Sequence, residues 1–146
     1  MKKRIWIFTA VLLCAAGLTA LLTQPWGYHR ILEVNWSWDL PAGYTELYGY
    51  SEPGFHGDGL RYHVLQYRRT GAETLDKIFF GAEPGTMGAE VTGKVNGWLA
   101  EIGVPEEWYP DYEGCICILS RQEDGSELAL FWDGADRILF AAESFY

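Results

Sequence analysis

The stretch CICILSRQEDGSELALFWDGADRILFAAE, residues 115–143, decides the fold of this 146-residue chain. It contains three strand-like runs, at 115–121, 127–132 and 137–143. The segments between them hold Asp124-Gly125 and Asp133-Gly134, which are typical of hairpin turns. We therefore expect three consecutive antiparallel strands. Because both alternating faces of the first and third runs are apolar, each face of the sheet should be covered.

Two more strands and two helices are expected upstream. The runs 45–50 and 60–67 predict an antiparallel pair joined by a glycine-rich loop. Residues 72–79 predict a short helix, and 91–102 a longer one with a face of Val91, Val95, Trp98, Leu99 and Ile102, which assigns Trp98 to the core. The fold class is therefore α+β, with a mainly antiparallel sheet of about five strands and one or two helices. The longer helix should cover one face, and either the shorter helix or the segment before residue 44 the other.

The N-terminus predicts a membrane anchor over residues 1–23. Lys2, Lys3 and Arg4 precede the uncharged run 5–22, which is near the lower limit of about 18 residues for a helix that spans a bilayer. Cations at the extreme N-terminus favour a cytoplasmic N-terminus and an extracytoplasmic remainder. A cleaved signal peptide, which would give a secreted protein, is the alternative, although the small residues of a cleavage site are poorly placed. A lipoprotein acylated at Cys14 is the third and least favoured possibility, because Val11-Leu12-Leu13 lacks the small residues expected before such a cysteine.

The remainder divides into an aromatic lead-in, 24–43, and an ectodomain, 44–146. Trp26 and Tyr28 stand where an aromatic belt at the membrane interface is expected. Three of the 11 Lys and Arg residues belong to the anchor, which leaves eight against all 20 Asp and Glu residues and a formal charge of −12. This acidity excludes nucleic acid as a partner, because phosphate backbones reward clustered cations. Cationic peptides and divalent ions stay compatible with it.

The loop Gly54-Phe55-His56-Gly57-Asp58-Gly59 is the most motif-like segment. His56 and Asp58 between glycines could meet a ligand closely, or the same residues could form an ordinary tight turn. His63 follows on the next strand. Two histidines and one aspartate lack a fourth ligand, so neither a metal site nor a cofactor is predicted.

Exposed aromatic rings and carboxylates supply the other candidates. Trp36, Trp38 and Trp108 are candidate binding residues, because exposed rings contact sugars and peptides. The acidic patch of Glu106, Glu107, Asp111 and Glu113 beside Trp108 has the composition of a glycoside-hydrolysing cleft. Because Pro105 and Pro110 bracket it as a surface loop, we favour a solvated acidic loop.

Cys115 and Cys117 are expected to be small apolar core residues. Two positions apart on a strand, their Cα atoms lie near or beyond the usual disulfide limit of ~6.8 Å.

The order of these parts resembles that of functionally uncharacterised small membrane-anchored extracytoplasmic proteins of Gram-positive bacteria. The shared features are the basic and apolar start, the 54–59 loop before an aromatic strand, and the C-terminal hairpins with Asp-Gly turns. The resemblance implies a membrane-anchored chain with an extracytoplasmic domain and supplies no catalytic residues. We expect a binding or accessory module of unknown ligand, with a protein, peptide or cell-wall partner and membrane lipid around residues 5–22. The alternatives are a small cell-wall hydrolase that uses carboxylates and His56, and a structural subunit of a membrane complex.

Overall fold

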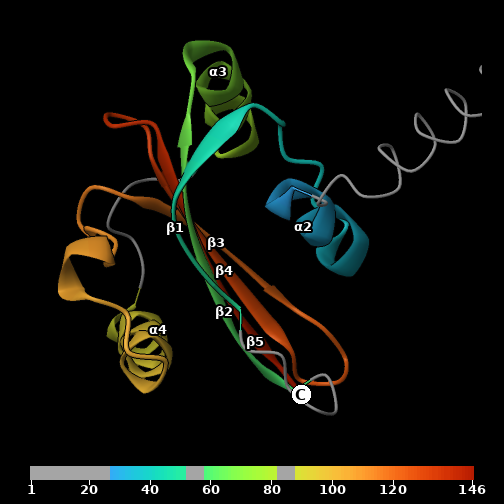
Figure 1. Cartoon of the computed structure of the whole chain (residues 1–146), viewed down its shortest axis with the longest axis vertical. Helices are drawn as coiled ribbons and strands as arrows, with labels where there is room; N and C mark the ends of the chain where they lie inside the picture. The colour runs from blue at the N-terminus through green and yellow to red at the C-terminus, as the bar shows by residue number, and fades with distance from the viewer. Residues whose placement is uncertain (1–26, 52–57, 82–87) are drawn as a thin grey trace, which may run out of the picture.

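Five antiparallel strands form one sheet with helices on both of its faces (Figure 1). The computed structural model describes residues 27–51, 58–81 and 88–146. The strands are β1 (Tyr44–Ser51), β2 (Gly59–Tyr67), β3 (Ile116–Arg121), β4 (Glu127–Asp133) and β5 (Ile138–Phe145), in the spatial order β1-β2-β5-β4-β3. The predicted α+β class is confirmed, as are the β1–β2 pair and the C-terminal meander. β5 joins the two units by pairing with β2.

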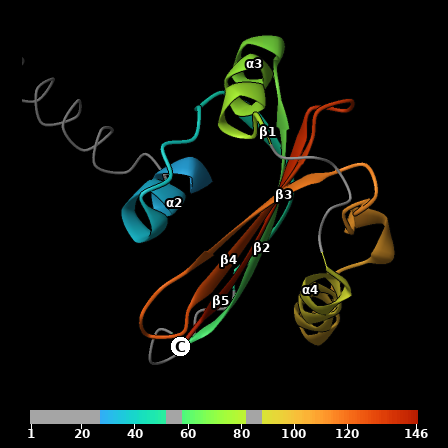
Figure 2. The ribbon, with the colours of Figure 1, turned by 180° about the vertical axis from the view of Figure 1, so that it is seen from behind.

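The sheet separates two apolar cores because side chains alternate between its faces along each strand. On β4, Leu128, Leu130 and Trp132 belong to one core, and Ala129 and Phe131 belong to the other. Helices α2 and α4 stand on opposite sides of the edge-on sheet in Figures 1 and 2. The expectation that both faces are covered is confirmed.

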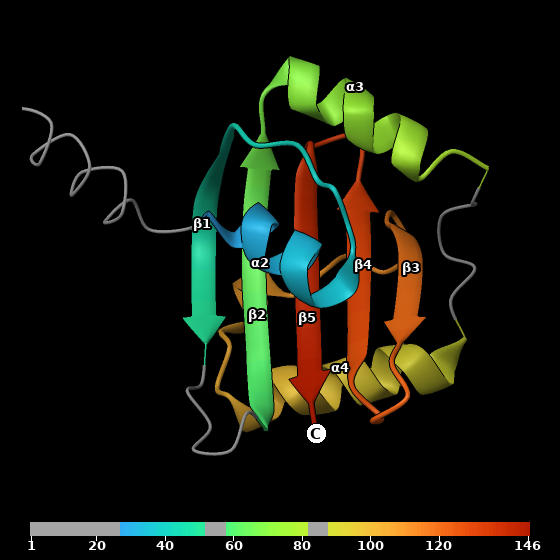
Figure 3. The same cartoon turned by 90° about the vertical axis from the view of Figure 1, so that its right-hand side faces the viewer.

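Helices α3 (Arg69–Ile78) and α4 (Ala89–Glu101) confirm the two predicted helices. Figure 3 shows α3 across one end of the sheet and α4 behind the other end. Val95 and Leu99 of α4 are fully buried, but Trp98 is half-buried at the side of the helix, so its assignment to the core was incomplete. Gly103, with φ +67°, ends the helix, and Val104 N donates to Leu99 O over 2.9 Å.

Helix α2 (Tyr28–Trp36) lies where the sequence predicts only a lead-in. Tyr28, Leu32 and Trp36 are spaced i, i+4 and i+8, so they form one face of the helix, and all three are buried against the sheet. Tyr28 therefore belongs to the domain core and not to a membrane-interface belt. The aromatic density suggested a membrane boundary because no aliphatic residue other than Leu32 marks that face.

The cysteines of the C-terminal meander are free thiols, as expected. Cys115 is buried and Cys117 is half-buried, and both pack in the core beneath α4. Burial raises the pKa of each thiol to about 12, with Asp133 as a smaller influence on Cys115.

Candidate functional site

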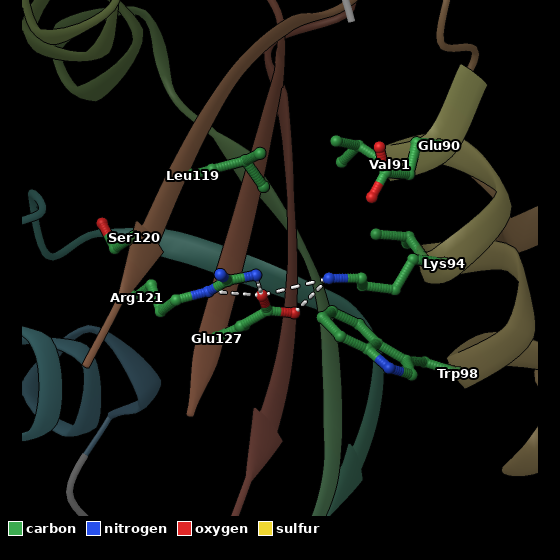
Figure 4. A pocket seen from close by; sticks show the side chains of 9 residues that line it. Glu90, Val91, Lys94, Trp98, Leu119, Ser120, Arg121 and Glu127 are labelled. Carbon is green, nitrogen blue, oxygen red and sulfur yellow. Dashed lines mark hydrogen bonds and ion pairs between the residues drawn. The ribbon is translucent and has the colours of Figure 1, made fainter. Parts of the chain in front are cut away.

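A groove of about 360 Å³ runs between α4 and the edge of the sheet formed by β3 and β4. Val91, Trp98 and Leu119 supply its apolar lining, and Leu119 is 52% exposed. Figure 4 shows Trp98 directed from the helix toward the strands, and Leu119 on the sheet side across from Val91. Because Val95 and Leu99 anchor α4 in the core, Val91 and Trp98 are left at its flank and form one wall of the groove.

Three charged side chains meet at one end of the groove. Lys94 Nζ lies 2.8 Å from Glu127 Oε2, and Arg121 Nε donates to Glu127 Oε1 over 2.7 Å. Partial burial raises the pKa of the Glu127 carboxyl, but the hydrogen bonds from both cations outweigh this, and the pKa lies below its usual value. At this end one carboxylate neutralises only one of two cations, which leaves a local surplus of one positive charge, while over the whole lining Glu90 balances it. Glu90 lies beside Val91 at the other end (Figure 4).

The main chain of β3 offers hydrogen-bonding groups beside this groove. Within the described ranges β3 pairs only with β4. Gln122 N donates to Ser126 O over 2.9 Å, so Gln122 and Ser126 form a hydrogen-bonded pair at the end of the β3–β4 ladder. Since hydrogen-bonded and non-hydrogen-bonded pairs alternate in an antiparallel ladder, the N–H and C=O groups of Cys117, Leu119 and Arg121 point away from β4.

A second polar cluster is buried under α2, around Glu143. This carboxylate is 0% exposed, accepts a 2.6 Å hydrogen bond from Trp36 Nε1, and accepts another from the Tyr28 hydroxyl. Burial raises the pKa of Glu143, although both donors and the nearby Arg61 guanidinium act in the opposite direction. Two donors thus hold a carboxylate inside the apolar core that lies under α2.

His63 extends this cluster toward the β1 edge. The imidazole stacks on the Tyr28 ring, with 3.6 Å between centroids, and is hydrogen-bonded to Glu46 and Ser51. Leu139, Ala141 and Glu143 alternate along β5 and share the face toward α2. This period-2 pattern could have predicted from the sequence that Glu143 is buried. Glu46 and Ser51 carried no such signal, because their meeting depends on strand register.

Of the six predicted binding residues, the five that the structure describes do not lie in one place. Trp36 and His63 share the cluster around Glu143 and Tyr28, where Trp36 is a core residue. Trp38 donates to Ser120 Oγ over 3.1 Å on the same face of the sheet. Trp108 lies on the opposite face, in the short helix η1 (Glu106–Trp108), and stacks on Tyr48. Asp58 is exposed at the start of β2, and His56 lies outside the described residues.

The acidic patch does not form a carboxylate pair in a cleft. All four carboxylate residues, Glu106, Glu107, Asp111 and Glu113, are exposed. Asp111 Oδ1 instead accepts from the Glu113 backbone N–H over 3.2 Å, which organises the local turn. This geometry favours the solvated loop over the hydrolytic cleft.

Neither a membrane span nor a metal site is found in the described part of the chain. No helix among residues 27–51, 58–81 and 88–146 is long and apolar enough to cross a bilayer, and residues 5–22 fall outside these ranges. In the same ranges no three His, Cys, Asp or Glu side chains gather as metal ligands. The chain matches no known protein family, no curated protein and no solved structure.

Proposed function

We propose that this chain is a membrane-anchored extracytoplasmic module that binds an extended peptide segment in the groove beside β3. The observation that carries the proposal is the juxtaposition of outward-pointing main-chain groups at Leu119 and Arg121 with an apolar groove lined by the same strand. An extended peptide that adds to a sheet edge gains main-chain hydrogen bonds, and alternate side chains enter the adjoining groove. The six residues of β3 match a peptide of about that length.

The chemistry of the groove defines the peptide. Val91, Trp98 and Leu119 form an apolar site for one aliphatic or aromatic side chain. The surplus positive charge of Lys94 and Arg121 over Glu127 fits one carboxylate next to it. Because the chain is strongly acidic overall, it repels a peptide with several carboxylates. The proposed peptide therefore carries a single carboxylate.

The anchoring part of the proposal is supported by the sequence alone. The basic residues 2–4 and the uncharged run 5–22 favour a helix in the bilayer with the C-terminal domain outside. A protease added to intact cells should remove the C-terminal domain, and fractionation should leave the full-length chain in the membrane. Full-length protein in the cytosol would contradict this part.

Peptide binding is tested with the full-length chain in detergent micelles. The probe is a fluorescent heptapeptide of alternating threonine and apolar residues that contains one glutamate, followed by fluorescence anisotropy. Two matched probes replace the glutamate by lysine, or carry N-methyl groups on alternate amides. We expect each change to weaken binding by about tenfold or more, the first through charge and the second through lost main-chain hydrogen bonds.

Two substitutions at one position separate the side chain from the main chain. Leu119→Ala removes the apolar contact, while Leu119→Pro also removes an N–H that points away from β4, so the β3–β4 ladder is preserved. We expect Leu119→Pro to bind at least tenfold more weakly than Leu119→Ala. Equal binding by both would refute strand addition. Light scattering that shows a dimer instead would indicate that a second copy occupies this edge, in favour of the structural-subunit alternative.

A further inference from the structure

A serine, a histidine and a glutamate are connected in series on the face of the sheet that α2 covers. The Ser51 hydroxyl lies 3.2 Å from His63 Nε2, and His63 Nδ1 is hydrogen-bonded to Glu46 Oε1. Because a carboxylate only accepts, the proton of the neutral imidazole resides on Nδ1. Nε2 is then free to accept from Ser51. The order of contacts is that of a nucleophilic serine with its base and the group that orients the base.

A β-bulge in β1 creates this alignment. Glu46 pairs with Leu65 and Tyr48 with Val64, so one extra residue lies between the two pairs. Without it, Glu46 and Ser51 would point to opposite faces, because side chains alternate along a strand. The bulge places Gly49 and Ser51 on the same face as Glu46, and bulges of this kind often adjoin active sites.

Gly49 leaves the space that this contact occupies. A Cβ built at this position would lie 2.5 Å from Glu46 Oε1 and 3.2 Å from His63 Nδ1. Any other residue would therefore displace the carboxylate from the histidine. The absence of a side chain at position 49 is a requirement of the constellation, independent of the hydrogen bonds themselves.

His63 and Ser51 differ in their access to solvent. His63 is 8% exposed beneath the Tyr28 ring, whereas Ser51 is exposed at the end of β1. Burial lowers the pKa of His63, the Glu46 carboxylate opposes this, and the Arg61 guanidinium reinforces it. The imidazole is thus neutral near pH 7 and able to take a proton, while the hydroxyl can be reached by a substrate.

We infer that Ser51, His63 and Glu46 form a nucleophilic site that hydrolyses carboxylic esters through an acyl-serine. Ser51 Oγ forms a bond to the carbonyl carbon while its proton passes to His63 Nε2. The bond from that carbon to the ester oxygen then breaks, and the leaving alcohol takes the proton from His63. Water repeats the sequence on the acyl-serine, which releases the acid and restores the hydroxyl. Glu46 orients the imidazole and stays ionised.

This activity is separate from the peptide groove. Ser51 and Glu46 belong to β1, which is the opposite edge of the sheet from β3. The constellation also faces α2, whereas the groove faces α4. Failure of one proposal therefore leaves the other in place.

The test uses the full-length chain in detergent, a fluorophosphonate probe and 4-nitrophenyl acetate. Ser51 should be labelled, as located by peptide mass spectrometry, and Ser51→Ala should lose both the labelling and the acetate hydrolysis. His63→Gln should lower the labelling rate by about 100-fold or more, and Glu46→Gln by at least about tenfold. Ser37→Ala, at an exposed serine outside β1, is the matched control and should label as the unchanged chain does.

A purely structural role would give different results. The labelling rate should rise with pH as His63 loses its proton, with a midpoint below pH 6.5, because burial lowers the pKa of His63 from that usual value. Tryptophan fluorescence should show that Ser51→Ala and Glu46→Gln unfold at the same urea concentration as the unchanged chain. Labelling of the unchanged chain no faster than that of Ser51→Ala would overturn the inference. A rate that is independent of both His63 and Glu46 would overturn it equally.

Discussion

Removal of the Glu143 side chain should destabilise the domain, although it also removes a buried charge. Glu143→Ala leaves the Tyr28 hydroxyl and Trp36 Nε1 without their acceptor, in a region where both residues are buried. Each unpaired buried donor costs about 1–3 kcal/mol, so the two together cost about 2–6 kcal/mol. Relief from burying a carboxylate offsets part of this. We expect a net loss of about 3 kcal/mol in the free energy of unfolding.

Glu143→Gln is the matched variant, because it removes the charge but retains an oxygen for Trp36. Its amide oxygen can accept from Nε1, and its NH2 group can donate to the Tyr28 oxygen. The free energy of unfolding should change by less than about 1 kcal/mol. Both variants are compared by urea unfolding of the full-length chain in detergent, followed by tryptophan fluorescence and linear extrapolation.

Glu143→Gln and the unchanged chain should also differ in how the free energy of unfolding depends on pH. Burial raises the pKa of Glu143, so the unfolded chain releases this proton at a lower pH than the folded chain does. The stability that this group contributes is complete below about pH 4.5 and is lost as the pH rises through the folded pKa. Glu143→Gln lacks that loss and should gain stability relative to the unchanged chain between pH 4.5 and 8.

The neighbouring titratable groups do not alter this comparison. His63, Glu46, Arg61 and Tyr28 are present in both proteins, so to first order their contributions cancel. An Ala variant within about 0.5 kcal/mol of the unchanged chain would refute the pairing of the two donors with Glu143. An equal decrease in the free energy of unfolding for Glu143→Ala and Glu143→Gln would show that the two unpaired donors are not the cause of the destabilisation.

Three further predictions concern the rest of the domain. Iodoacetamide at pH 8 should alkylate Cys115 and Cys117 about a thousandfold more slowly in the folded chain than in urea, by mass spectrometry, because burial raises each pKa from 9.0 to about 12. Both Arg137 and Gly103 have positive φ, which glycine adopts without strain. Arg137→Gly should therefore raise the free energy of unfolding by about 1 kcal/mol, and Gly103→Ala should lower it by a similar amount, as measured by urea unfolding. Leu99→Ala should cost about 2–5 kcal/mol in the same assay.

The strands and two of the helices could be predicted from the sequence because their signals are local. The period-2 alternation of β2, the Asp-Gly turns beside β4 and the apolar spacing of α4 each lie within a short window. Helix α2 escaped prediction because Tyr28 and Trp36, on its buried face, also fit a membrane interface. The pairing of β5 with β2 is a contact between distant segments, which no local pattern specifies.

The candidate sites could be predicted only in fragments, because they depend on register and on neighbours across the sheet. His63 was identified, but its partners Glu46 and Ser51 face it only because of the bulge in β1. Lys94 and Arg121 are 27 positions apart and meet through Glu127. Isolated motifs such as the 54–59 loop attract attention in a sequence, whereas sites assembled from single residues on several strands do not.

The strand order has a consequence for the time at which the sheet can form. β5 is the last of the five described strands along the chain, yet it occupies the middle of the sheet and connects β2 to β4. Until residues 138–145 have left the ribosome, the β1–β2 and β3–β4 hairpins lack the strand that hydrogen-bonds to both of them. The sheet therefore cannot close before β5 emerges, and until then the polypeptide stays in a state compatible with threading through a translocation channel.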